Sequence, residues 1–249
     1  MTIESGDSGK QAVISVQHLY KRFGHFAANN DLNFDVFEGE IFGFLGANGA
    51  GKTTAIKILC GLSKPTSGEI HVAGYDVYTQ TEKIKRSIGY MSQKFSLYDD
   101  LTITENIRFY GGIYGLNKKI IKERTRELLE EFLLNDYRDT LISSLPLGWR
   151  QKLAFSVAVL HRPKIVFLDE PTSGVDPITR RQFWELIYNA SARGITVFVT
   201  THYMDEAEYC DRVSIMVDGK IDALDSPDEL KKQFAAKNMD EVFLKLARG

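Results

Sequence analysis

The sequence is poor in cysteine, has no long apolar run and carries almost no excess of either charge. Its two cysteines, Cys60 and Cys210, lie far apart without metal-ligand spacing, which excludes a disulfide framework and favours a reducing cytosol. No apolar run approaches the roughly 18 residues of a membrane span, and the polar start of the chain lacks the apolar core of a signal peptide. We therefore expect any membrane role to depend on another chain.

The charge balance limits the classes of partner. Lysine and arginine number 31 against 33 aspartate and glutamate residues, and the formal net charge is −2. Bulk electrostatics therefore gives no reason to expect nucleic acid as a partner. With 249 residues, of which 43% are hydrophobic, the chain can bury the core of one large α/β domain or of two closely joined lobes.

A glycine-rich stretch, GANGAGKTT at residues 46–54, separates an apolar run from a helical pattern. Glycines let backbone N–H groups surround phosphate oxygens, and the start of the following helix adds a partial positive charge. Lys52 would reach the β- and γ-phosphates, and Thr53 would bind Mg²⁺. The pattern therefore predicts a nucleotide polyphosphate site. Its expected binding residues are Gly46, Asn48, Gly49, Ala50, Gly51, Lys52, Thr53 and Thr54.

Strand and helix patterns alternate along most of the chain. Apolar runs predict strands at residues 13–16, 32–37, 41–45, 69–72, 164–168, 195–200 and 213–217, with a hairpin after the last. Helical spacing indicates helices at residues 106–114, 122–134, 149–160 and 178–193, and a helical tail at about 227–246. The alternation predicts an α/β fold with a mostly parallel sheet covered on both faces, whose strands gather ligand groups at their carboxyl ends.

Two acids follow the apolar strand at residues 164–168. Carboxylates there are costly to bury without a cation, and Mg²⁺ held by Thr53 and phosphate oxygens would supply one. We expect Asp169 on the metal side and Glu170 as the residue that orients and polarises the attacking water. The alternative is a pair of acids that cap the next helix. His202 follows another strand in the same way; it would donate to a γ-phosphate oxygen or be an ordinary histidine.

The sequence resembles the ATP-binding subunit of an ABC transporter over about residues 13–246, and its motifs occur in the order that is usual in this family. Residues 46–54 resemble the family's Walker A loop, and IVFLDEP at 165–171 resembles its Walker B strand with the catalytic glutamate. The resemblance implies a P-loop NTPase fold, ATP and Mg²⁺ as cofactors, and ATP hydrolysis. It adds roles for Gln93 as the Q-loop glutamine that senses metal and γ-phosphate, Asp176 in the D-loop, His202 as the switch histidine and Phe23 as the ring that stacks on adenine. Ordinary core packing is the alternative for Phe23.

One family element is altered. The signature loop, usually Leu-Ser-Gly-Gly-Gln, aligns with LPLGW at residues 145–149. In the family this loop closes over ATP bound to a second subunit. Pro146 offers neither a hydroxyl nor an N–H, whereas Gly148 and the helix start near Trp149 preserve part of the anion site. We expect weakened but not abolished hydrolysis. The altered loop resembles that of exporter ATPases of the ABC-2 class.

The resemblance also implies a domain organisation. One ABC ATPase domain, residues 12–249, is expected after a flexible tail at residues 1–11. Within it we expect a nucleotide-binding core with an N-terminal antiparallel β subdomain at 12–92 and 151–226, a helical subdomain with the signature loop at 93–150, and a C-terminal helical tail at 227–249.

The partners implied are a second ATPase subunit, identical or different, and a transmembrane permease, with the chain on the cytoplasmic face of the membrane. The permease would contact residues 95–98 and the helix at 106–114, where aromatic side chains could equally belong to the core. The leading hypothesis is an ATPase that drives an ABC-2 exporter of drug, lipid or polysaccharide. Two alternatives stay open: a weakly hydrolytic member of a heterodimeric pair, and a soluble ABC ATPase without a transport role.

Overall fold

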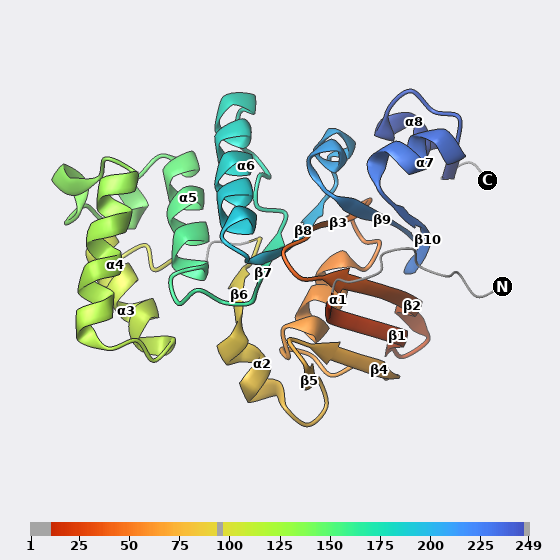
Figure 1. Cartoon of the computed structure of the whole chain (residues 1–249), viewed down its shortest axis with the longest axis horizontal. Coiled ribbons are helices and arrows are strands. Elements are labelled where there is room, and N and C mark those ends of the chain that lie inside the picture. The colour runs from red at the N-terminus through yellow and green to blue at the C-terminus, as the bar shows by residue number, and fades with distance from the viewer. Residues whose placement is uncertain (1–10, 94–96, 247–249) are drawn as a thin grey trace.

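The computed structural model describes residues 11–93 and 97–246, which form two β-sheets with helices packed around them (Figure 1). The expected tail at residues 1–11 lies outside this part except for Gln11. The smaller sheet lies beside the larger one, and the helices of residues 103–158 form a separate layer at the far side (Figure 1).

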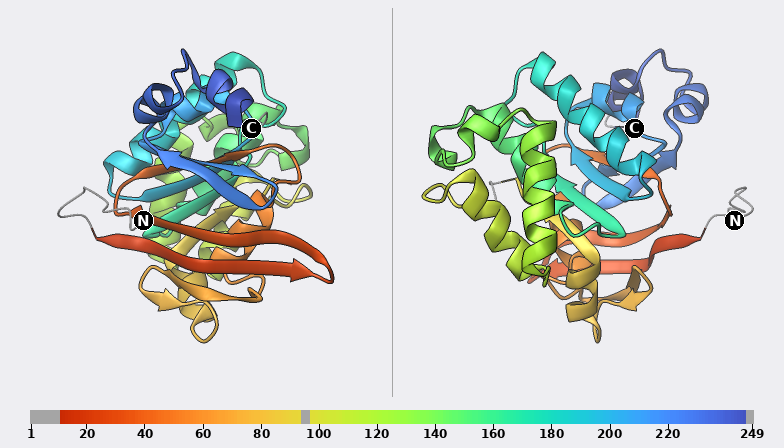
Figure 2. Two further views of the ribbon diagram at one scale, coloured as in Figure 1. Left: turned by 90° about the vertical axis from the view of Figure 1, so that its right-hand side faces the viewer. Right: turned by 60° about the vertical axis from the view of Figure 1, so that its left-hand side comes forward.

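The smaller sheet is antiparallel, with its strands in the order β2-β1-β4-β5. Its strands are β1 (Ala12–Phe23), β2 (Phe26–Phe37), β4 (Ser67–Val72) and β5 (Tyr75–Asp76). β1 and β2 form a long hairpin that crosses the molecule (Figure 2). The short strands expected at residues 13–16 and 32–37 are therefore wrong in extent. The added residues mix polar and apolar side chains without alternation, so backbone pairing extends the strands where no apolar pattern marks them.

The larger sheet has the strand order β10-β9-β3-β8-β7-β6, and only the β10–β9 pair among these is antiparallel. Its strands are β3 (Ile41–Gly46), β6 (Ile88–Met91), β7 (Ile165–Asp169), β8 (Thr196–Thr201), β9 (Arg212–Val217) and β10 (Lys220–Asp225). The predicted fold class, a P-loop NTPase core with a mostly parallel sheet, an antiparallel β subdomain and a helical insertion, is confirmed. β6 and the helix before it, α2 (Thr81–Ser87), were not predicted, because α2 buries only Ile84 and Gly89 interrupts the short apolar run of β6.

Alternate residues of the central strands pack into two different cores. Phe42 and Phe44 of β3 join Phe167 and Phe198 in the core shared with the antiparallel sheet. Their neighbour Leu45 belongs to the core shared with the helices of the opposite face. Because both faces are covered, β3, β7 and β8 are buried throughout.

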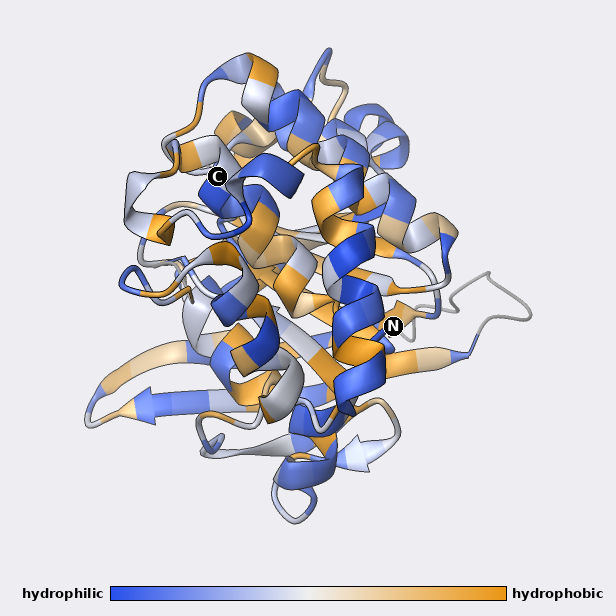
Figure 3. Cartoon of the chain, turned by 90° about the vertical axis from the view of Figure 1, so that its left-hand side faces the viewer, coloured by the Kyte–Doolittle hydropathy of each residue, from blue (hydrophilic) through white to orange (hydrophobic). Residues whose placement is uncertain are grey.

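The helices cover both faces of the larger sheet. They are α1 (Lys52–Leu59), α3 (Ile103–Ile113), α4 (Lys118–Glu131), α5 (Leu147–Ala158), α6 (Pro177–Ala192), α7 (Pro227–Gln233) and α8 (Met239–Leu246). The expected C-terminal helical tail is thus two helices. Hydrophilic and hydrophobic turns alternate on the helices of the α3–α4 side (Figure 3), as expected for amphipathic helices over a core. Among residues 11–93 and 97–246 we find no helix with the length and apolarity to cross a bilayer.

Candidate functional site

The predicted phosphate loop connects β3 to α1 at the carboxyl edge of the larger sheet. Gly51 has a φ of 103°, and a Cβ on it would lie 2.1 Å from the Ala28 carbonyl oxygen, so only glycine fits there. Residues 47–49 are exposed at the loop tip, whereas Ala50 is buried. The loop thus offers exposed backbone at the start of a helix, as phosphate binding requires.

Lys52 is the first residue of α1 and is only 4% exposed. Its Nζ donates to the carbonyl oxygens of Gly46, at 2.7 Å, and Ala47, at 3.2 Å. The same ammonium lies 3.3 Å from Glu170 Oε1. A buried cation needs such partners, and here they come from the loop itself and from the end of β7.

The Glu170 carboxylate is the meeting point of three predicted site residues. Besides Lys52, the Gln93 amide Nε2 donates to Glu170 Oε2 at 3.1 Å, and His202 Nδ1 lies 3.0 Å from that oxygen. Glu170 is 8% exposed, so these contacts form in a sheltered environment. The structure therefore brings together four residues that lie far apart in the sequence.

The Glu170 backbone adopts a conformation that the sequence does not reveal. Its φ is 50°, in the left-handed region that non-glycine residues seldom adopt. The Glu170 N–H donates to the Thr200 carbonyl oxygen at 3.2 Å and to its Oγ1 at 3.0 Å, which holds the turn. Sequence reasoning missed Thr200, and its place at the end of a predicted strand was the only signal.

Asp169 lies beside this cluster at the end of β7. It accepts hydrogen bonds from the hydroxyls of Thr53, at 3.2 Å, and Thr200, at 2.8 Å. Burial raises the pKa of Asp169, and the two hydroxyls only partly oppose that shift. A carboxylate that is costly to ionise beside a hydroxyl fits a position next to a divalent cation.

The donor set is consistent with Mg²⁺ that keeps water and phosphate oxygens as most of its ligands. Within residues 11–93 and 97–246, no group of three or more His, Cys, Asp and Glu residues is arranged to hold a metal ion by itself. Thr53 Oγ1 and Asp169 Oδ1 supply adjacent oxygens, and the Gln93 amide donates to the carboxylate of Glu170, the residue after Asp169. The predicted ligands Thr53, Asp169 and Gln93 thus remain a prediction that the geometry fits.

Phe23 stands at the end of β1, opposite Phe26 of β2. Its side chain is 57% exposed, so the core-packing alternative is wrong. The Lys21 ammonium lies 4.9 Å from the ring centroid. An exposed ring beside a cation is suited to stacking on a nucleotide base, and that role stays a prediction.

The altered signature loop leads into α5. Pro146 is the N-cap residue, with a φ of −55°, and makes no side-chain capping hydrogen bond. Gly148 packs against the start of α6, because a Cβ on it would lie 2.5 Å from Thr179 Cγ2. Asp176 caps α6 by accepting from the N–H groups of Ile178 and Thr179, both at 3.0 Å. The nucleotide roles of Asp176 and Gly148 stay predictions.

A cavity of about 340 Å³ opens between these two helix starts. Gly148, Trp149, Lys152 and Asp176 are among its lining residues. The start of α5 and the Lys152 ammonium, which donates to Gln182 Oε1 at 2.7 Å, make this cavity suitable for an anion.

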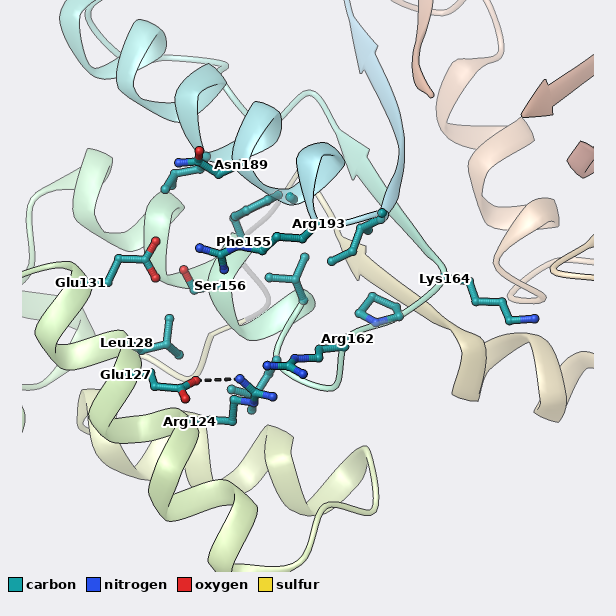
Figure 4. A pocket seen from close by; sticks show the side chains of 17 residues that line it. Arg124, Glu127, Leu128, Glu131, Phe155, Ser156, Arg162, Lys164, Asn189 and Arg193 are labelled. Atoms are coloured by element: carbon teal, nitrogen blue, oxygen red, sulfur yellow. Dashed lines mark hydrogen bonds and ion pairs between the residues drawn. The ribbon is translucent and has the colours of Figure 1, made fainter. Parts of the chain in front are cut away.

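A second and larger cavity lies elsewhere, at the other ends of α5 and α6. It measures about 850 Å³ and is lined by α4, the end of α5, the turn before β7 and the end of α6. Arg124 pairs with Glu127 on its rim, and Arg162 and Arg193 lie across from α4 (Figure 4). None of the predicted nucleotide residues lines it.

Aromatic side chains gather on one surface of the helical layer. The ring centroids of Tyr98 and Phe109 are 4.8 Å apart, and those of Phe109 and Tyr110 are 5.4 Å apart. Tyr98, Phe109 and Ile113 are 47%, 41% and 61% exposed, so these three do not belong to the core. Residues 95 and 96 of the predicted permease contact lie outside the described residues.

Comparison with known proteins gives one consistent family. The ABC transporter family model matches residues 29–173. The chain is 47% identical over 95% of its length to the probable multidrug ABC transporter ATP-binding protein YbhF of Escherichia coli (strain K12), of which it covers 42%. It is 34% identical over 95% of its length to the linearmycin resistance ATP-binding protein LnrL of Bacillus subtilis (strain 168), of which it covers 79%. The chain thus spans less than half the length of the first of these relatives.

Solved structures agree with this result. The ATP-binding subunit of an ABC transporter superimposes with a TM-score of 0.85 at 30% identity, over 94% of this chain and 99% of the other. The cassette MJ0796, solved as a dimer with ADP and Pi, superimposes with a TM-score of 0.77 at 26% identity, over 86% and 98% of the two chains. The chain therefore belongs to the ABC transporter family as an ATP-binding domain, and the domains of this family hydrolyse ATP.

Proposed function

We propose that this chain hydrolyses Mg-ATP at sites formed between two copies of itself, and that the closing and reopening of this dimer drives a separate transmembrane permease. The observation that carries the proposal is the convergence of Lys52, Gln93 and His202 on the Glu170 carboxylate. Each of these side chains has a direct use at a γ-phosphate.

Lys52 would leave Glu170 for the β- and γ-phosphates when ATP binds, because phosphate oxygens carry more negative charge than one carboxylate. Glu170 would then orient and polarise the attacking water as a general base. His202 would likewise turn from the Glu170 carboxylate when ATP binds, so that its ring N–H donates to a γ-phosphate oxygen. Thr53, Asp169 and Gln93 would hold Mg²⁺, which neutralises developing charge on the phosphates.

The second half of each site would come from the partner copy. The start of α5, with Gly148 and Lys152, would face the γ-phosphate bound to the other subunit's loop, and the 340 Å³ cavity beside it offers the space. The dimeric structure of MJ0796 with ADP and Pi supports such a pairing in the family. We assign residues 12–92 and 151–226 to the nucleotide-binding core, 93–150 to the helical subdomain and 227–249 to the C-terminal tail.

The permease would contact the exposed apolar surface of Tyr98, Phe109 and Ile113. Exposed apolar side chains grouped on one face are typical of protein interfaces. Tyr98 follows Gln93 by five residues in the sequence, so a contact there could reach the catalytic centre. Such a contact would place the chain at the cytoplasmic face of the membrane.

An exporter of the ABC-2 class with a drug or lipid cargo is our proposal for the transporter. Two observations support it: the altered LPLGW loop, and relatives named for multidrug transport, linearmycin resistance and, in Homo sapiens, phospholipid transport by ABCA3. The last is 38% identical over 90% of this chain.

A test uses the purified chain. We expect Mg²⁺-dependent ATP hydrolysis whose rate rises more steeply than linearly with protein concentration, because a site needs two subunits. Hydrolysis strictly proportional to protein concentration down to nanomolar dilution, with gel filtration showing a monomer under turnover, would contradict the dimeric site.

A further inference from the structure

A buried carboxylate that none of the predicted roles explains lies behind the switch histidine. Glu206, in the 3₁₀ segment η3 (Met204–Tyr209), is fully buried at 0% exposure. A carboxylate in such a place is costly unless it is hydrogen-bonded and paired with a cation. Its partners therefore show what it holds in place.

Two partners reach Glu206 from different elements. The Thr172 hydroxyl donates to Glu206 Oε1 at 2.6 Å, and Arg180 Nε lies 3.6 Å from the same oxygen. Glu206 Oε2 and Arg180 Nε are buried without a hydrogen-bond partner in the described structure. The charge pair is thus close but not fully bonded, so a small movement of either side chain would change its strength.

Both partners belong to segments next to the catalytic centre. Thr172 follows Glu170 by two residues, in the turn that begins with the left-handed backbone at Glu170. The Arg180 guanidinium lies 4.0 Å from the centroid of the Tyr203 ring, and that ring lies 4.2 Å from the ring of His202. Glu206 therefore connects the segments that carry Glu170 and His202.

Arg180 also lies at the start of α6, next to the start of α5 and the altered loop before it, which together form the signature half of the site. Its neighbour Thr179 contacts Gly148 so closely that no side chain would fit there, and its hydroxyl donates to Asp176 at 2.6 Å. A displacement of Arg180 along α6 would therefore move the surface on which α5 begins.

We propose that Glu206 is a positioning residue that, through Thr172 and Arg180, keeps His202 and Glu170 aligned and links this catalytic centre to the same chain's signature half. The proposal rests on the roles proposed above for Glu170 and His202. It predicts that weakening the pair slows turnover without weakening ATP binding to the phosphate loop.

The test is Glu206→Gln, which keeps an oxygen for the Thr172 hydroxyl and removes the charge that faces Arg180. We expect kcat to fall about tenfold while the Kd for ATP changes less than about twofold, since none of the three residues touches the phosphate loop. Arg180→Met should give a similar loss, and the double variant should be no slower than either single one. Asp205→Asn, which removes the exposed charge beside Arg180, is the control and should keep the wild-type rate.

A merely structural role gives a different pattern. Equal losses in the two single variants that multiply in the double variant, or a weakened Kd for ATP, would overturn the proposal. If Glu206→Gln does not fold, Thr172→Val and Thr172→Ser replace it: valine should slow turnover and serine restore it, and two equal rates would overturn the proposal. Glu170→Gln in the same assay distinguishes a failure of the proposed function from a failure of the positioning role of Glu206. A fully active Glu170→Gln variant would contradict the proposed function itself.

Discussion

The phosphate-binding half and the signature half of this chain differ in how they are held together. In the first, Lys52, Gln93 and His202 all contact Glu170, and Asp169 is bonded to two hydroxyls. In the second, a proline caps α5 without a side-chain bond, and a cavity opens between two helix starts. Contacts within one chain hold the side chains of the first half, whereas the second half is an open surface that a ligand bound to another chain can reach.

The difference teaches where sequence change is tolerated. Removing one group from the first half leaves a buried charge without its partner, which costs more than the lost bond. In the second half, Pro146 is exposed and its replacement of a serine leaves no buried group unpaired. We therefore expect substitutions in the signature loop to cost the fold less than substitutions in the phosphate half.

The largest effect is expected from a substitution that inactivates the phosphate half. Glu170→Gln should lower kcat by about 10²- to 10⁴-fold, because it removes the general base, and should trap an ATP-bound dimer. ATP hydrolysis and gel filtration with ATP measure the two effects. Glu185→Gln, on the exposed face of α6, is the matched control. A wild-type rate in Glu170→Gln would show that another group activates the water.

The next largest effect is expected from a substitution that returns the usual serine to the signature half. Pro146→Ser would return a hydroxyl that can bond a charged phosphate, so we expect kcat to rise about tenfold. Pro146→Ala returns the N–H alone and separates the two contributions. Equal rates for the proline, alanine and serine forms would show that the residue is not limiting, and would remove the support for a weakly hydrolytic subunit in a heterodimeric pair.

A smaller effect concerns the adenine end of the phosphate half. Phe23→Ala should weaken ATP binding about fivefold through the loss of about 1 kcal/mol of stacking. Phe26→Ala is the control, because Phe26 pairs with Phe23 in the hairpin and is 63% exposed. Calorimetry measures both Kd values. An equal effect of both substitutions, or none, would remove Phe23 from the site.

The smallest effect on turnover is expected from a substitution of His161, beyond the end of α5. It should change the stability of the fold and leave the activity of the two halves unchanged. His161 stacks on Tyr114, and burial lowers its pKa from 6.5 to about 4. Because the depressed pKa favours the neutral form in the folded state, this stabilisation is present above about pH 6.5 and is lost as the pH falls towards 4. His161→Gln should make the urea midpoint of unfolding depend less on pH in this range. Parallel curves for the two proteins would contradict it.

Much of the fold and of the phosphate half could be predicted from the sequence. Residues 46–54 follow a pattern that the chemistry of phosphate binding fixes, and Asp169, Glu170 and His202 stand directly after apolar runs. The parallel sheet brings such positions to one edge, so alternation of strands and helices was enough to group them.

The rest depends on contacts that no local pattern encodes. The left-handed backbone at Glu170, the support from Thr200 and the burial of Glu206 arise from the packing of segments about 30 residues apart. Strand extent was misjudged in the β1–β2 hairpin, because backbone pairing continues where the residues are polar. Gln93, Asp176 and Phe23 needed the family resemblance, since an isolated glutamine, aspartate or phenylalanine has no distinctive spacing.

The most direct test of the two-half site mixes two inactive variants. Lys52→Ala disables the phosphate half, and Leu147→Asp, at an exposed position that lines the cavity of the signature half, places a carboxylate against the γ-phosphate there. In a mixed dimer one site carries both defects and the other carries none. Equal mixing should therefore restore ATP hydrolysis to about a quarter of the wild-type rate. A mixture no more active than its separate components would contradict a site shared between two copies of this chain.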